Sequence, residues 1–226
     1  MISRRTLLSS AVAVSLFALS RQAIAADTLP ISAKARDLLR VLDSYDLDHL
    51  WQAGVRVHWD TGEPTGREVA VTPEHKHTHC SAFVASVAKR LGIYILRPPE
   101  HSATLLANAQ LDWLESAPAN SGWRSIGTAE AAQAAANAGD FVVACYRNQK
   151  SDRPGHIAVV RPSDRPVSAI AADGPEITQA GLHNYRDTTL RTGFAGHPRA
   201  WAKDREIRFF AHAWDGKEHF TGATTF

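Results

Sequence analysis

Cys80 and His156 are the residues of this sequence whose types and positions best suit nucleophilic chemistry. Cys80 opens a run with apolar residues at helical spacing that ends at Gly92, so we expect it in the first turn of a helix. Unpaired backbone N–H groups and the helix dipole favour negative charge there. The position therefore predicts a thiol pKa lowered from about 8.5 into the range of roughly 3.5–7.5.

His156 is the best candidate for the base beside that thiol. It stands at the head of the apolar, β-branched run 157–160, which is typical of a buried strand. An imidazole in this place could keep Cys80 ionised and then protonate a leaving amine. The two residues together predict a Cys–His thiolate mechanism, which uses no metal and no cofactor.

The order of these motifs resembles that of papain-like thiol hydrolases. His79–Val84, "HCSAFV", resembles the Asp-Cys-Ser-Gly-Phe-Val signature of NlpC-type cell-wall peptidases. The strands "AGDFVVACY" and "GHIAVV" resemble that family's Gly-Asp-Leu-Val-Phe-Phe and His-Val-Gly-Ile pair, and CHAP amidohydrolases share the order. The sequence departs from the pattern at Ala82, where the family has Gly, and no third His follows on the next strand.

The resemblance implies an α+β papain-like fold, with N-terminal helices, a nucleophile at a helix start and a C-terminal antiparallel sheet. It also implies a third polar group, on the strand after the one that carries His156, to orient the imidazole. Gln179, Asn184 and Asp173 are the available side chains, and we favour them in that order. The implied activity is that of a cysteine peptidase or amidase, with peptidoglycan peptide stems as substrate.

Residues 1–25 have the pattern of an export signal, so we expect residues 26–226 to form a single domain. Arg4 and Arg5 precede the apolar stretch 7–19, and Ala23-Ile24-Ala25 is a typical cleavage site. The segment "SRRTLL" is also similar to a twin-arginine motif, which leaves both Sec and Tat export open. These features predict a periplasmic or secreted protein with no membrane span in its mature form.

The charge balance argues against nucleic acid as a partner. Without Arg4, Arg5 and Arg21, the 25 basic residues become 22, against 23 acidic ones, and phosphate binding needs a basic face. We expect a monomer that binds peptidoglycan or a peptide. His75, His77 and His79 alternate along the chain, but no fourth ligand with motif spacing follows them, so we interpret them as a loop before Cys80 and not as a metal site.

Two further functions remain open at this point. Cys80 and Cys145 could form a disulfide in an oxidising compartment, which would make the protein a binding module without turnover. Against this, Cys145 alternates with Phe141 and Val143, as a small buried hydrophobe in a strand does. A thiol acyltransferase, similar to a transglutaminase, would use the same nucleophile and base.

The remaining patterns predict the elements that position these residues. We expect Ser32 to cap an amphipathic helix, Ser102 to cap a helix that runs to about residue 116, and Thr128 to cap an Ala-rich helix. The polar residues of the second helix, Asn108, Gln110 and Asp112, could face a groove, but we favour a solvated face. Expected strands cover residues 68–72, 140–146, 156–161, 167–171, 176–179 and 206–214.

Overall fold

The computed structural model describes residues 27–67, 76–150, 152–201 and 206–219. The expected export signal and the expected strand at residues 68–72 lie outside these ranges. Within them, no helix is long and apolar enough to cross a membrane.

An antiparallel sheet of six strands forms the centre of the fold, and the expected α+β class is confirmed. Its strand order is β1-β6-β2-β3-β4-β5. The strands are β1 (Trp123–Ile126), β2 (Phe141–Tyr146), β3 (His156–Val160), β4 (Glu176–Gln179), β5 (Tyr185–Thr189) and β6 (Arg208–His212). The described helices are α2 (Ala33–Asp43), α3 (Cys80–Arg90), α4 (Leu106–Ser116), α5 (Ala129–Asn137), α6 (Val167–Asp173) and α7 (Leu190–Gly193), with a 3₁₀ turn, η1, at Ala119–Ser121.

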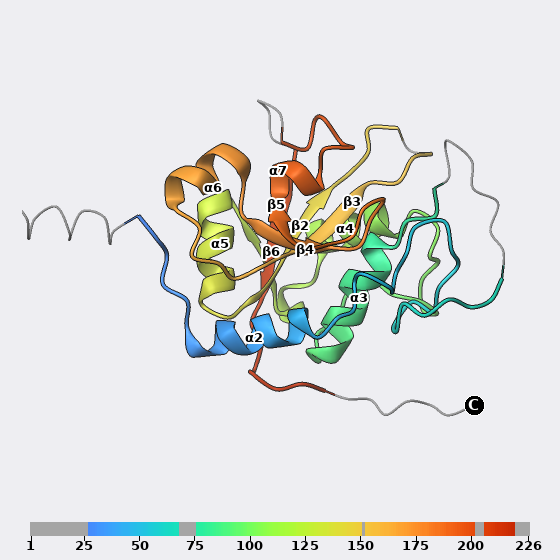
Figure 1. Cartoon of the computed structure of the whole chain (residues 1–226), viewed down its shortest axis with the longest axis horizontal. Coiled ribbons are helices and arrows are strands. Elements are labelled where there is room, and N and C mark those ends of the chain that lie inside the picture. Colours follow the sequence, from blue (N-terminus) through green and yellow to red (C-terminus); the bar gives the residue numbers. More distant parts are fainter. Residues whose placement is uncertain (1–26, 68–75, 151, 202–205, 220–226) are drawn as a thin grey trace, which may run out of the picture.

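Helices cover both faces of this sheet. Figure 1 shows α5 and α6 on one side of the strands and α3 on the other. Each face has its own apolar cluster: α2, α3 and α4 pack on the face that includes Val143, Cys145 and Ile157. The opposite face, which includes Ala144 and Val160, packs against α5, α6 and α7. Every residue of β2 and β3 is therefore buried, which explains why both strands are apolar almost throughout.

Two predicted helix starts are confirmed by their capping bonds. Ser32 Oγ accepts a hydrogen bond from the N–H of Ala35 at 3.1 Å, and Thr128 Oγ1 accepts one from Ala131 at 3.1 Å. Each bond satisfies a backbone donor that has no partner inside its helix. The predicted pairing of β2 with β3 is also confirmed, with Cys145 opposite Ile157.

Several predicted elements were wrong. Residues 167–171 belong to helix α6, because Ala and Ile suit a helix as well as a strand once Pro166 fixes its start. Ser102 does not cap α4, which begins later, at Leu106. The sequence analysis also did not predict strand β1, which starts at Trp123, or strand β5. Both lie at the edges of the sheet, where the apolar pattern is weakest.

Cys145 contributes packing to the α3 face, since its side chain is fully buried and it forms no disulfide. Cys145→Ala should therefore lower the free energy of unfolding by about 1–3 kcal/mol, the usual effect of trimming a buried side chain. Urea denaturation monitored by circular dichroism measures this loss. A variant as stable as the wild type would contradict the packing role.

Candidate active site

Cys80 occupies the first position of α3, as predicted. The residue before it, His79, has a non-helical backbone and does not cap the helix with its side chain. The backbone N–H groups of the first turn are thus left to other acceptors. Cys80 itself is only 4% exposed and packs within the apolar cluster of the α3 face.

The expected lowering of the Cys80 pKa was wrong. Burial raises the pKa of this thiol, because the thiolate loses its hydration. The backbone N–H groups of Ile157, Ser81 and Cys80 favour the thiolate and oppose that rise without cancelling it. Here desolvation therefore outweighs the helix start.

His156 is the first residue of β3, and its side chain is hydrogen-bonded to Gln179 on β4. Its Nε2 lies 2.8 Å from Oε1 of Gln179, and the two side chains are 6% and 2% exposed. The favoured third residue is thus the one that the fold places against the imidazole. Its role in catalysis stays a prediction.

The partners of Gln179 fix the tautomer of His156. Nε2 of Gln179 donates to the carbonyl of His183 at 3.2 Å, so the amide must turn its Oε1 toward the imidazole. Oε1 can only accept, so Nε2 of His156 carries the proton. The other ring nitrogen, Nδ1, then keeps a free lone pair, and it forms no hydrogen bond within the described ranges. This is the tautomer that a general base needs.

Burial also lowers the pKa of His156, to about 4, while the bond to Gln179 opposes this shift. The imidazole packs edge-on against Phe194, with centroids 4.6 Å apart, and stacks on His197 at 5.5 Å. Burial and the neighbouring His156 lower the pKa of His197 to about 4 as well. The sequence analysis did not single out Phe194 or His197, because they follow α7 and lie far from any motif.

Ile157 brings Cys80 and His156 to the same place in the fold. The backbone N–H of Ile157, the next residue after His156, points to the thiol of Cys80. The two side chains approach from different faces, because Cys80 packs in the α3 cluster while Phe194, beside His156, belongs to the opposite cluster. No hydrogen bond joins Cys80 directly to His156 in the described part of the chain.

The other two candidates for the third residue have different partners. Nδ2 of Asn184 donates to the carbonyls of Leu47 and Leu50, each at 3.0 Å, and its Oδ1 accepts from the N–H of Gly181. Asp173 ends α6 and pairs with two arginines, Arg165 and Arg191. Asn184 therefore links two loops through hydrogen bonds, and Asp173 forms surface ion pairs. Neither side chain is hydrogen-bonded to His156 in the described part of the chain.

The histidines before Cys80 have separate surroundings. His75 lies outside the described residues. His79 donates from Nε2 to the carbonyl of Val55 at 2.7 Å, and burial lowers its pKa. Nε2 of His79 is therefore already hydrogen-bonded to the backbone of the loop that contains Val55.

Two amides on α4 lie beside the candidate site, where the sequence analysis expected a solvated helix face. Gln110 is fully buried and donates from Nε2 to the carbonyls of Ser81 and Leu96. Asn108 bonds to the loop that precedes His156. Helix α4 is thus rotated about its axis so that Gln110 faces the core and not solvent. The spacing of apolar residues along α4 could not show this, because it does not reveal that the carbonyls of Ser81 and Leu96 accept from a buried side chain.

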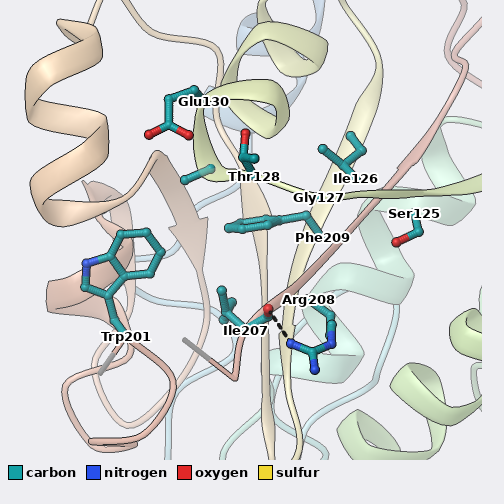
Figure 2. A pocket seen from close by; sticks show the side chains of 10 residues that line it. Ser125, Ile126, Gly127, Thr128, Glu130, Trp201, Ile207, Arg208 and Phe209 are labelled. Atoms are coloured by element: carbon teal, nitrogen blue, oxygen red, sulfur yellow. Dashed lines mark hydrogen bonds between the residues drawn. The ribbon is translucent and has the colours of Figure 1, made fainter. Parts of the chain in front are cut away.

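A separate pocket lies on the opposite side of the sheet from α3. Its lining includes Thr128, which caps α5, Glu130 of α5, Trp201, Ile207, and Phe209 of β6 (Figure 2). None of the residues that line it is a cysteine or a histidine, so it offers no nucleophile or imidazole base.

No protein-family model matches the chain, and no curated protein is similar to it at a significant level. The function therefore has to be argued from the side chains at this end of the sheet.

The lowered pKa values of the buried His156 and the partly buried His197 predict that stability falls as the pH drops from about 6.5 to 4. In this range the unfolded histidines bind protons and the folded ones do not, so protons favour unfolding. For the buried His156, the shift corresponds to on the order of 3 kcal/mol. Urea denaturation across this range should show the loss.

His156→Gln should make this pH dependence shallower. His49→Gln is the matched control, since His49 is exposed and its ring bonds to the exposed Asp46. A slope that is unchanged in His156→Gln would contradict the assignment of a buried neutral imidazole.

Proposed function

We propose that the protein is an exported cysteine amidase or peptidase with a papain-like, NlpC-type fold, and that it cleaves amide bonds in peptidoglycan peptide stems. The observation that carries the proposal is the buried hydrogen bond between Nε2 of His156 and Oε1 of Gln179. This bond leaves Nδ1 of His156 unprotonated. The next residue in the chain is Ile157, and its backbone N–H points to the Cys80 thiol. The substrate class rests on the family resemblance and on the expected export signal.

The reaction begins from a neutral thiol and a neutral imidazole. Nδ1 of His156 takes the proton of Cys80 as the sulfur attacks the substrate carbonyl carbon, and the backbone N–H of Cys80 stabilises the oxyanion. The imidazolium then protonates the amide nitrogen, so the C–N bond breaks and the amine leaves. Water attacks the remaining thioester and gives its proton to His156. The C–S bond then breaks as His156 returns that proton to the sulfur, so the acid leaves and the Cys80 thiol is restored.

Burial of the site favours a second candidate, a thiol acyltransferase. Cys80, His156 and Gln179 are nearly inaccessible, so the site limits the entry of water to the thioester. An amine that binds next to the site could then accept the acyl group in place of water. Release of free acid without any added amine would exclude this alternative.

Mass spectrometry of digested peptidoglycan tests the proposal directly. The wild-type protein should release peptide fragments with new carboxyl and amino groups, and Cys80→Ala should release none. Because Cys80 is buried, its variant is expected to be somewhat less stable, so folding should be checked by circular dichroism. Cys145→Ala is the matched control, since it also removes a buried thiol and should still cleave; equal cleavage by Cys80→Ala would refute the proposed nucleophile.

The pH profile of kcat/KM should show a broad plateau. The acid limit should lie near 4, where His156 becomes protonated, and the alkaline limit above the ordinary thiol pKa of about 8.5, because burial raises the pKa of Cys80. These limits belong to the coupled pair. An acid limit near 6.5 would show that His156 is solvated during turnover.

Gln179→Ala should lower kcat by about 10²- to 10⁴-fold, because Nε2–H of His156 loses its acceptor and the tautomer is no longer fixed. The acid limit should also move down, since the bond to Gln179 raises the pKa of His156. Asp173→Asn, which is far from the imidazole, serves as the control. A Gln179→Ala variant with the wild-type kcat would remove Gln179 from the mechanism.

A further inference from the structure

Helix α4 contacts both halves of the candidate site through two amide side chains that are two residues apart. Gln110 reaches the first turn of α3, where Nε2 donates to the carbonyl of Ser81 at 3.1 Å. Ser81 is the residue next to Cys80. The same nitrogen donates to the carbonyl of Leu96 at 2.9 Å, which ties α4 to the segment that follows α3.

Asn108 reaches the loop that leads into His156. Its Oδ1 accepts from the N–H of Gly155 at 2.8 Å, and its Nδ2 donates to the carbonyl of Arg153 at 3.0 Å. The amide thus holds both ends of the tripeptide 153–155, in which Pro154 has a fixed φ. These two bonds set where β3 starts, and with it the position of His156.

Gly155 makes the contact with Asn108 possible. A Cβ atom at this position would collide with the carbonyl oxygen of Tyr146 and with Oδ1 of Asn108. Glycine therefore lets the α4 amide approach the backbone immediately before His156.

We infer that Asn108 and Gln110 are positioning residues, which together hold the nucleophile helix and the base strand at a fixed separation. Neither is a catalytic residue: Gln110 acts through Ser81 and Asn108 acts through Gly155. The inference rests on the proposed function for its effect on turnover, whereas its structural part concerns only the placement of His156. A misplacement of about 1 Å between reacting groups can reduce a rate by about 10²-fold.

Asn108 offers the cleaner test, because Gln110 is fully buried and its loss would leave two carbonyls without their donor. Asn108→Ala removes both bonds to the loop. Asn108→Asp keeps an acceptor for the N–H of Gly155 but loses the donor to Arg153. Asp112→Asn is the matched control, since Asp112 lies one turn further along α4 and pairs with Arg147 instead of the tripeptide.

In hydrolysis of purified peptidoglycan stems, Asn108→Ala should lower kcat by about 10- to 100-fold with KM changed less than about twofold. Asn108→Asp should fall between Asn108→Ala and the wild type, and Asp112→Asn should match the wild type. Equal kcat values in Asn108→Ala and Asp112→Asn would overturn the inference. So would a loss in Asn108→Ala that appears in KM alone.

A second readout does not depend on turnover. The ¹⁵N chemical shifts of the His156 imidazole should report a single Nε2–H tautomer in the wild type and in Asp112→Asn. In Asn108→Ala they should report a mixture of tautomers, because the ring is no longer held against Gln179. If the wild type cleaves no amide, the proposed function fails, and the chemical shifts alone test the positioning role. Unchanged shifts in Asn108→Ala would then refute that role.

Discussion

The hydrogen bond between His156 and Gln179 depends on the register of two strands. Val159 pairs with Thr178, which places Gln179 opposite Ala158 and on the same sheet face as His156. Ala158 has a small side chain, so the amide can reach across it to the imidazole. A slip of one residue would turn Gln179 to the other face and leave a buried imidazole N–H without an acceptor.

Burial favours the neutral forms of both Cys80 and His156. Desolvation moves the thiol pKa up and the imidazole pKa down, and each shift favours the neutral form of its group. The backbone N–H groups of Ile157, Ser81 and Cys80 oppose the shift of the thiol pKa, and the bond to Gln179 opposes the shift of the imidazole pKa, but burial is the larger effect on each group. Charge would then develop only when a substrate is present, where its carbonyl and leaving nitrogen take part in the proton transfers.

The parts of the fold that the sequence predicted are those with strong local signals. Ser32 and Thr128 are residue types that cap helix starts with a side-chain oxygen. The apolar run after His156 indicates a strand that is buried on both faces of the sheet. The α6 segment was mistaken for a strand because short apolar runs fit both structures. Within the candidate site, the family resemblance implied a polar partner for His156 and Gln179 was the favoured of three candidates, but the burial of Gln110 depends on tertiary contacts that no local pattern contains. The direction of the Cys80 pKa shift was missed for the same reason, since the depth of burial is a property of the assembled core.

The position of β6 in the sheet has a consequence for how the chain reaches its native state. β6 is the last strand among the described residues, yet it lies between β1 and β2 and pairs with both of them. During synthesis, one edge of the apolar strand β2 therefore stays unpaired until residues 208–212 have left the ribosome. An exposed apolar edge of this kind can pair with another chain. The sooner residues 208–212 insert between β1 and β2, the shorter is the time for which this edge is exposed.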